Sequence, residues 1–303
     1  MSVAELPLIQ QLAGDRPGPV LGLLGGVHGD ELEGVVAVRA VLGAIAPATL
    51  RGSVLWAAPA HPEAWQADTR VGPRDGLNLA RVFPGDAAGS PTEQVAAALT
   101  AELIARCDLL IDLHSAGRGF DMPLLVGYHS SGPLAPRSAA AAAAFAAPFI
   151  WEHPESAGGR SLSAAEALGK PSIYVEGRGG GRLRQRDLDG YVGGVLRVLL
   201  DQGMIDDAPS APVPVRVRGD GNTDEGITAP APGFFVCAAE VGDRVEAGQP
   251  IGRILSDDAV LNAEIAAPTS GRVMLLRRSA RVTVGDTVAI VASEVSCEPG
   301  SAA

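Results

Sequence analysis

Residues 19–31 read PVLGLLGGVHGDE, and this stretch decides how the N-terminal part of the chain folds. Residues 19–24 are an apolar run typical of a buried strand, and the glycine pair that follows predicts a tight turn. Helical spacing of apolar residues starts at Glu31 and continues to Ile45. The stretch therefore predicts a strand, a turn and a helix, with His28 and Glu31 where the turn meets the helix.

The same alternation continues to about residue 200. Apolar runs predict further strands at residues 54–58, 108–113 and 172–175, and helical patterns are found at residues 92–106, 139–147 and 188–200. Strands that alternate with helices favour an α/β fold with a mostly parallel, mixed sheet flanked by helices. We predict such a domain over residues 1–205.

A change of pattern after Leu200 predicts a second domain. Residues 206–212 are rich in Pro, Ala and Asp, which indicates a linker. Residues 213–303 contain short apolar runs, the first at residues 213–217, separated by Gly and Pro, which predicts an all-β domain.

The predicted β domain contains a weak internal repeat. Ala229-Pro230 followed by Gly233 recurs 38 residues later as Ala267-Pro268 followed by Gly271. Two related halves suggest a flattened barrel-sandwich, which resembles the biotinyl/lipoyl carrier modules. Those modules need a lysine at a hairpin tip, and the chain has no lysine after Lys170. We therefore expect a domain of this type without an attached group.

Composition limits the classes of binding partner and the cellular compartment that we expect for this protein. The 303 residues include 24 basic and 35 acidic side chains, a net charge of −11, and 47% are apolar. This balance, with no Lys/Arg-rich stretch, disfavours nucleic-acid and anionic-membrane partners. Three cysteines without paired spacing fit a reducing compartment, and we find neither a leader pattern nor an apolar run of about 18 residues. We expect a cytoplasmic protein and leave open whether it forms a homo-oligomer.

Three residues predict a metal site. His28 and Glu31 lie three positions apart at a helix start, where both can face one ion, and His114 follows an apolar strand. In open α/β sheets, sites form outside the carboxyl ends of strands. Each residue alone has a plainer interpretation, as a turn histidine, a first-turn acid or a core histidine. Two histidines and one carboxylate together form a common catalytic zinc shell, so we predict one Zn²⁺ per chain.

Glu176 and an arginine-rich segment supply the other candidates. Glu176 ends a predicted strand beside a glycine-rich loop, where a carboxylate can take a proton from a metal-activated water, or can simply pair with Arg178. Residues 69–85 carry Arg70, Arg74 and Arg81 among Gly and Pro. Three arginines suit the capture of a carboxylate and the stabilisation of an oxyanion, although a solvated surface loop is the alternative.

Taken in this order, the four segments resemble the succinylglutamate desuccinylase/aspartoacylase family, a branch of the zinc carboxypeptidase fold, over most of residues 18–200. The β domain also looks like that of this family. The resemblance implies that His28, Glu31 and His114 bind zinc and that Glu176 is the general base and acid. It also implies that Arg70 polarises the substrate or stabilises an oxyanion, and that Arg81 binds the substrate carboxylate.

One position departs from the family pattern. Family members usually read Asn-Leu-Asn-Arg, whereas this chain reads Asn78-Leu79-Ala80-Arg81. On an extended segment Asn78 would point to the same side as residue 80 but about 6 to 7 Å away, so it would not replace the missing amide. We predict a small carboxylate-bearing substrate in contact with Arg81, Asn78, Arg74 and Arg178, and leave its acyl group and amine open.

The expected function is hydrolysis of the amide bond of a small N-acyl amino acid or N-acyl amine. A carboxypeptidase or an esterase on the same site is an alternative. A non-catalytic metal-binding relative is another, favoured by Ala80 alone.

Overall fold

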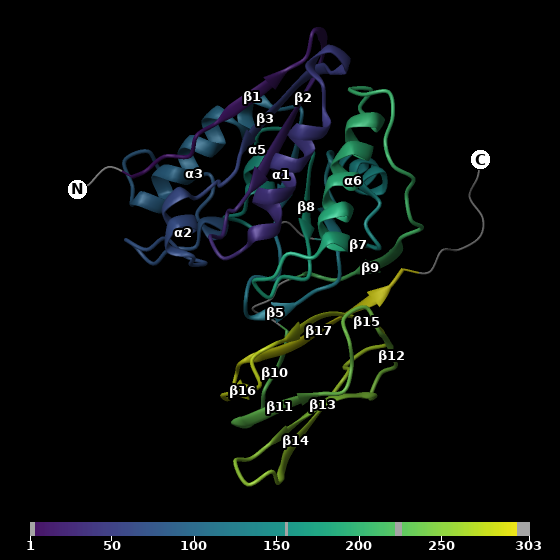
Figure 1. Ribbon diagram of the computed structural model, residues 1–303. Helices are drawn as coiled ribbons and strands as arrows, with labels where there is room; N and C mark the ends of the chain where they lie inside the picture. The colour runs from purple at the N-terminus through teal and green to yellow at the C-terminus, as the bar shows by residue number, and fades with distance from the viewer. Residues whose placement is uncertain (1–3, 155–156, 222–225, 296–303) are drawn as a thin grey trace.

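The computed structural model describes residues 4–154, 157–221 and 226–295. A helix-covered N-terminal part and a C-terminal β part lie one above the other, joined along a continuous mixed sheet (Figure 1). The fold class predicted from the sequence is confirmed. None of the helices in the described ranges has the length and apolar character needed to cross a bilayer.

The described residues of the N-terminal part contain nine strands. They are β1 (Gln10–Ala13), β2 (Arg16–Gly25), β3 (Arg51–Ala57), β4 (Leu109–Leu113), β5 (Phe120–Asp121), β6 (Leu125–His129), β7 (Phe149–His153), β8 (Ser172–Glu176) and β9 (Val215–Arg218). Their order in the sheet is β1-β3-β2-β4-β8-β6-β7-β9, with β5 elsewhere. β2, β3, β4 and β8 are mutually parallel, so their carboxyl ends meet at one edge.

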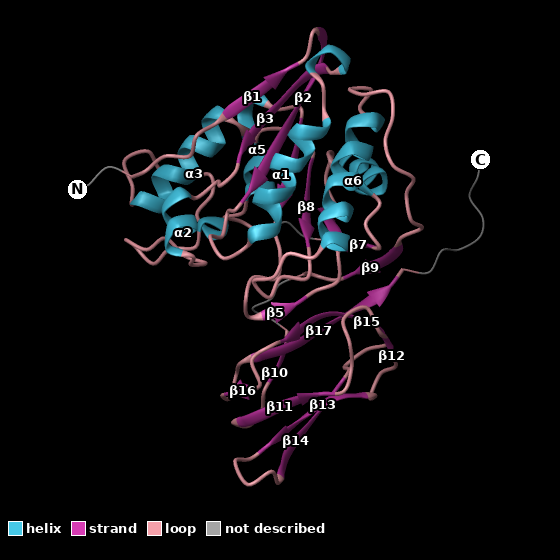
Figure 2. Cartoon of the chain, viewed as in Figure 1, coloured by secondary structure: helices cyan, strands magenta, loops and turns pink. Residues whose placement is uncertain are grey.

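Six helices cover this sheet on both faces (Figure 2). They are α1 (Leu32–Ala44), α2 (Pro62–Ala67), α3 (Pro91–Glu102), α4 (Ala135–Phe145), α5 (Ser161–Ala167) and α6 (Gln185–Asp201). Short 3-10 helices occupy Pro47–Thr49, Leu79–Arg81 and Ile104–Arg106. The helix predicted at residues 92–106 is therefore two elements. A Ser90–Glu93 capping box with Pro91 at the first position explains where α3 starts.

Successive side chains of the central strands point to opposite faces of the sheet and pack in two separate hydrophobic cores. Leu23 and Ile111 pack with α1, α4 and α6 on one face, whereas Leu24 and Leu110 pack with α3 and α5 on the other. All four are fully buried. A strand covered on both faces has to be apolar on both, which explains the continuous runs in the sequence.

In the C-terminal part, the regular elements of residues 226–295 are all strands. They are β10 (Ile227–Thr228), β11 (Gly233–Cys237), β12 (Arg244–Val245), β13 (Pro250–Leu255), β14 (Leu261–Ala266), β15 (Gly271–Arg277), β16 (Arg281–Val282) and β17 (Thr287–Glu294). β14-β13-β11-β16 form one sheet, and β17, β15 and β12 continue the large sheet. The two layers enclose a core that includes Phe235, Ile251 and Val273.

The strand near residue 215 does not belong to this sandwich. β9 pairs in parallel with β7 at the edge of the N-terminal sheet and antiparallel with β17. Val217 is fully buried beside Trp151 and Met274 in a core shared by the two parts. We expected the run at residues 213–217 to open the β domain, and β9 pairs with one strand of each part, which makes it the junction between them.

Candidate active site

Strand register brings the predicted chemical groups to one edge of the sheet. Gly25 at the end of β2 pairs with Leu113 at the end of β4, and Leu113 pairs with Val175 on β8. His28 comes shortly after the first of these ends, His114 directly follows the second, and Glu176 ends β8. The backbone N–H of His114 donates to the carbonyl of Val175 at 2.8 Å. The pairing of these strands therefore places His114 next to Glu176.

A glycine allows α1 to approach this edge closely. A Cβ atom on Gly34 would lie 2.2 Å from the carbonyl oxygen of Leu113, so only glycine permits this contact. The first turn of α1 therefore lies against the end of β4. Glu31, the residue that precedes α1, is brought beside His114 in this way.

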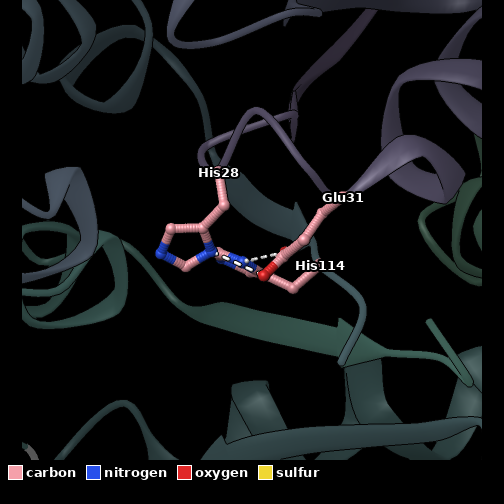
Figure 3. Close-up of side chains that lie close together, drawn as sticks. All are labelled: His28, Glu31 and His114. Atoms are coloured by element: carbon pink, nitrogen blue, oxygen red, sulfur yellow. Dashed lines mark hydrogen bonds and ion pairs between the residues drawn. The ribbon is translucent and has the colours of Figure 1, made fainter. Parts of the chain in front are cut away.

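His28, Glu31 and His114 converge on a point between them (Figure 3). One ligand atom from each side chain lies within 4.8 Å of the others, and all three side chains are buried. The Nδ1 atom of His28 lies 2.7 Å from Glu31 Oε1, and the Nδ1 atom of His114 lies 3.0 Å from Glu31 Oε2. Both histidines thus present the same nitrogen to the carboxylate.

The outer nitrogen of each ring has its own oxygen acceptor. His28 Nε2 lies 2.9 Å from Asn78 Oδ1, and His114 Nε2 lies 3.0 Å from Asp112 Oδ2. Metal-binding histidines characteristically donate their second N–H to an oxygen, which fixes the tautomer and the ring orientation. The two rings are therefore held with their Nδ1 atoms available for an ion.

Burial and charge set the ionisation of this cluster. Burial lowers the pKa of His28 below its usual range, which favours the neutral imidazole that binds metals. Burial raises the pKa of Glu31, but the two histidines outweigh it and hold the pKa well below the ordinary value. For His114, burial lowers the pKa, yet Asp112 and Glu31 outweigh it and raise the pKa. The two histidines thus have pKa shifts of opposite direction, because burial dominates at His28 and the neighbouring carboxylates dominate at His114.

Glu176 is a buried carboxyl group whose raised pKa suits it to proton transfer in a low-dielectric site. Burial, and next the charge of Glu31, raise its pKa to about 8. Among the residues that the structure describes, none donates a hydrogen bond to its Oε2 atom. That oxygen is available to accept a proton from a group in the adjacent cavity.

That cavity, which we call the histidine cavity, has a volume of about 100 Å³. Its lining includes His28, His114 and Glu176 together with three arginines, Arg70, Arg81 and Arg160. Arg70 donates to Glu31 Oε1 at 2.8 Å and is 45% exposed, so its guanidinium is shared between the cluster and solvent. The cavity therefore combines two histidines of the candidate metal site, the buried carboxyl group of Glu176 and the positive charges of three arginines.

A larger cleft of about 670 Å³ adjoins the histidine cavity and shares Arg70, Arg81 and Glu176 with it. We call it the interdomain cleft because its other wall belongs to the β part, through Arg277 and residues 285–287. Arg277 is held there by Asp286 at 3.3 Å. The β part thus forms one side of the approach to the metal cluster.

The segment around Ala80 differs from the extended conformation we expected. Residues 79–81 form a 3-10 helix, because the side chain of Asn78 caps it by accepting the Ala80 N–H at 2.9 Å. Asn78 reaches His28 and also lines the interdomain cleft, whereas Ala80 lines the histidine cavity. The methyl group of Ala80 thus occupies the place where the family pattern has an amide.

The structure does not bring Arg74 or Arg178 to either cavity. Arg74 forms a bidentate ion pair with Glu63, in which Nε donates to Oε2 at 2.7 Å and Nη2 donates to Oε1 at 2.6 Å. Arg178 lies 3.7 Å from Asp121 and 3.6 Å from Glu240. The nearby carboxylates account for both positions, and contact of Arg74 and Arg178 with the substrate stays a prediction.

Several site residues were missed by sequence reasoning. Asp112 is hidden within the apolar run of β4, and Arg160 precedes the short helix α5. His153 donates from Nδ1 to the Gly219 carbonyl at 2.8 Å, and its Nε2 lies 2.7 Å from the hydroxyl of Tyr174. Burial lowers the pKa of His153 to about 4, so the ring is neutral and accepts from Tyr174. Of these residues, only Asp112 could have been recognised from the sequence, because a charged residue inside an apolar strand indicates a buried partner.

Comparison with known proteins places these residues in a family. The model of the succinylglutamate desuccinylase/aspartoacylase catalytic domain matches residues 17–201. N-alpha-acetyl-L-2,4-diaminobutyric acid deacetylase of Halomonas elongata is 30% identical over 284 residues, which cover 92% of this chain and 83% of the relative.

Solved structures agree. A succinylglutamate desuccinylase/aspartoacylase from Rhodobacter sphaeroides superposes with a TM-score of 0.86 at 30% identity, covering 95% of this chain and 89% of the other. The product-bound ectoine utilization protein EutE (DoeB) from Ruegeria pomeroyi gives 0.86 at 25% identity, covering 95% and 93%. The chain belongs to the succinylglutamate desuccinylase/aspartoacylase family.

Proposed function

We propose that the protein is a zinc-dependent deacylase that hydrolyses the amide bond of a small N-acyl amino acid. The observation that carries the proposal is the histidine cavity, in which His28 and His114 of the metal cluster share one space with Glu176 and Arg70. Membership of a family whose named members include a deacetylase and desuccinylases supports the reaction class.

The donor set fits one Zn²⁺ per chain. Two imidazoles and a carboxylate are common ligands of catalytic zinc, and they leave a position for water or substrate. Here the Nδ1 atoms of both histidines and the Glu31 carboxylate face one another, while Asn78 and Asp112 hold the opposite nitrogens. Zinc held there would supply Lewis acidity to a water molecule and to the acyl carbonyl.

The protein's own groups account for the proton transfers. Glu176 accepts the proton that the attacking water loses, and then delivers it to the nitrogen of the leaving amine. Its position inside a buried cavity keeps bulk water from competing for that proton. The guanidinium of Arg70 faces the same cavity and stabilises the negative charge that develops on the carbonyl oxygen.

Charge in the cavity points to an amino acid as the amine half. Arg81 and Arg160 line the histidine cavity with Arg70 and suit a carboxylate on the substrate. Apart from Glu176, the acidic residue in the lining is Asp220, which suits a second, cationic amine. We therefore place N-alpha-acetyl-L-2,4-diaminobutyrate first among the substrates to test, since the relative from Halomonas elongata is named for it.

A substrate panel tests the proposal. Zinc-loaded protein is given N-acetyl and N-succinyl amino acids, dipeptides and matched esters, and release of the amine or alcohol is measured. The proposed function predicts that an N-acyl amino acid gives the highest kcat/KM. Faster release from dipeptides would indicate a carboxypeptidase, and faster cleavage of esters an esterase. Bound zinc without turnover of any compound would indicate a binding protein.

A further inference from the structure

Glu33 is a buried carboxylate that the proposed chemistry does not use. It lies in the first turn of α1, two positions after Glu31, and is 2% exposed. It is not among the side chains that line the histidine cavity or the interdomain cleft. Burying a carboxylate is costly unless hydrogen bonds compensate it, so its partners indicate what it does.

Those partners belong to two different loops. Glu33 Oε2 accepts the hydroxyl of Ser115 at 2.7 Å, and Glu33 Oε1 accepts the backbone N–H of Gly179 at 3.1 Å. Ser115 follows the metal-ligand candidate His114, and Gly179 follows Glu176 by three residues. One carboxylate thus connects the loop after β4 with the loop after β8.

The loop after β8 needs such a tie. Gly179, Gly180 and Gly181 have φ values of +65°, +77° and +63°, which lie in the left-handed region. Glycine adopts this conformation readily, but an unconstrained glycine segment populates other conformations as well, so contacts are needed to hold this one. A Cβ atom on Gly179 would lie 2.6 Å from the Gly117 carbonyl, so the two loops are in direct contact. The Ala116 N–H also donates to the Gly177 carbonyl at 3.1 Å.

We propose that Glu33 is a positioning residue that clamps residues 177–181 onto the loop that follows His114, and so fixes Glu176 relative to the metal ligands. The consequence for catalysis rests on the proposed role of Glu176 as general base. The clamp itself rests on the two hydrogen bonds of Glu33 alone.

Two substitutions at Glu33 separate hydrogen bonding from charge. In Glu33→Gln, the amide oxygen can still accept from Gly179, and the amide NH₂ can donate to the Ser115 hydroxyl, which also accepts. Glu33→Met keeps the length of the side chain and removes both bonds. Glu102→Met serves as the control, because Glu102 is a 63% exposed carboxylate on α3.

Hydrogen exchange of residues 177–181 and steady-state kinetics are measured on zinc-loaded protein, together with zinc content. We expect Glu33→Met to exchange about tenfold faster in this segment and to lose at least tenfold in kcat, with KM within about threefold of wild type. Glu33→Gln and Glu102→Met should stay within about threefold in every quantity. Unchanged exchange in Glu33→Met, or equal losses in the Gln and Met variants, would overturn the clamp.

Ser115→Ala provides a second route if Glu33→Met does not fold, because it removes one of the two bonds and leaves the carboxylate in place. It should accelerate exchange at residues 177–181 and lower kcat in the same direction but by less, and wild-type exchange there would also overturn the clamp. Wild-type protein without deacylase activity would refute the proposed function, while the exchange comparison would still decide whether Glu33 holds the loop.

Discussion

The Nε2 atom of His28 lies 2.9 Å from the Oδ1 atom of Asn78, and the same oxygen accepts the backbone N–H of Ala80. A backbone N–H can only donate, so the Asn78 atom that faces both groups is the oxygen. His28 must therefore carry a proton on Nε2, and its Nδ1 atom faces the Glu31 carboxylate, where a metal ion would be bound.

This relationship predicts that Asn78 supports metal binding. Asn78→Ala should weaken zinc affinity by about 10- to 100-fold, the usual cost of losing the oxygen that orients a metal-binding histidine. Affinity is measured by competition with a chromophoric chelator. Asn78→Asp keeps an acceptor for His28 and is the matched control. If Asn78→Ala bound zinc as tightly as wild type and changed only KM, Asn78 would be a substrate ligand instead.

Glu176→Gln should separate the base from the metal. The amide keeps the shape of the side chain but cannot take a proton, so kcat should fall by about 10²- to 10⁴-fold. Zinc content, measured by atomic emission, should stay at one per chain. A variant with nearly normal kcat would show that another group activates the water.

Ala80→Asn should raise KM for the preferred substrate. Ala80 is buried and lines a cavity of only about 100 Å³, so the larger side chain takes space from the amine half. A lower KM is expected instead if the only effect of the missing amide is that Arg81 binds the substrate carboxylate more weakly. A restored neutral hydrogen bond of about 1 kcal/mol would then lower KM about fivefold. Ala80→Gly, which leaves the space open, is the control, and KM is compared across the whole substrate panel.

His153 should make the fold sensitive to acid. Its pKa is lowered to about 4 in the folded protein, so the unfolded chain binds more protons between about pH 6.5 and 4. Stability is therefore present above pH 6.5 and is lost as the pH falls through this window. The groups around the ring are Tyr174, His129, Arg160 and Asp220.

The contribution of His153 amounts to about 2 to 3 kcal/mol between pH 6.5 and 4.5. His153→Gln retains a donor for Gly219 and an acceptor for Tyr174 but does not titrate. Urea unfolding at the two pH values should show a smaller loss for this variant than for wild type. Equal losses would mean that the ring is accessible to protons in the folded state.

The sequence alone predicts that His28, His114 and Glu176 lie close together, because each follows or ends an apolar run and parallel strands bring such positions to one edge. Roles that depend on local backbone geometry are not visible in this way. The Asn78 side chain caps the 3-10 helix of residues 79–81 and contacts His28 with the same oxygen, and Arg74 pairs with Glu63. The sequence also does not reveal that β9 pairs with a strand of each part, because a short apolar strand carries no sign of its neighbours.

The most direct test of the zinc-dependent deacylase is the metal requirement of turnover in wild type and His114→Ala. We expect one zinc per chain in dialysed wild type, loss of N-acyl amino acid hydrolysis after chelation, and recovery when Zn²⁺ is added back. His114→Ala should hold no stoichiometric zinc and should show no turnover even after Zn²⁺ is supplied. Full hydrolysis by zinc-free wild type, or by His114→Ala, would contradict the account.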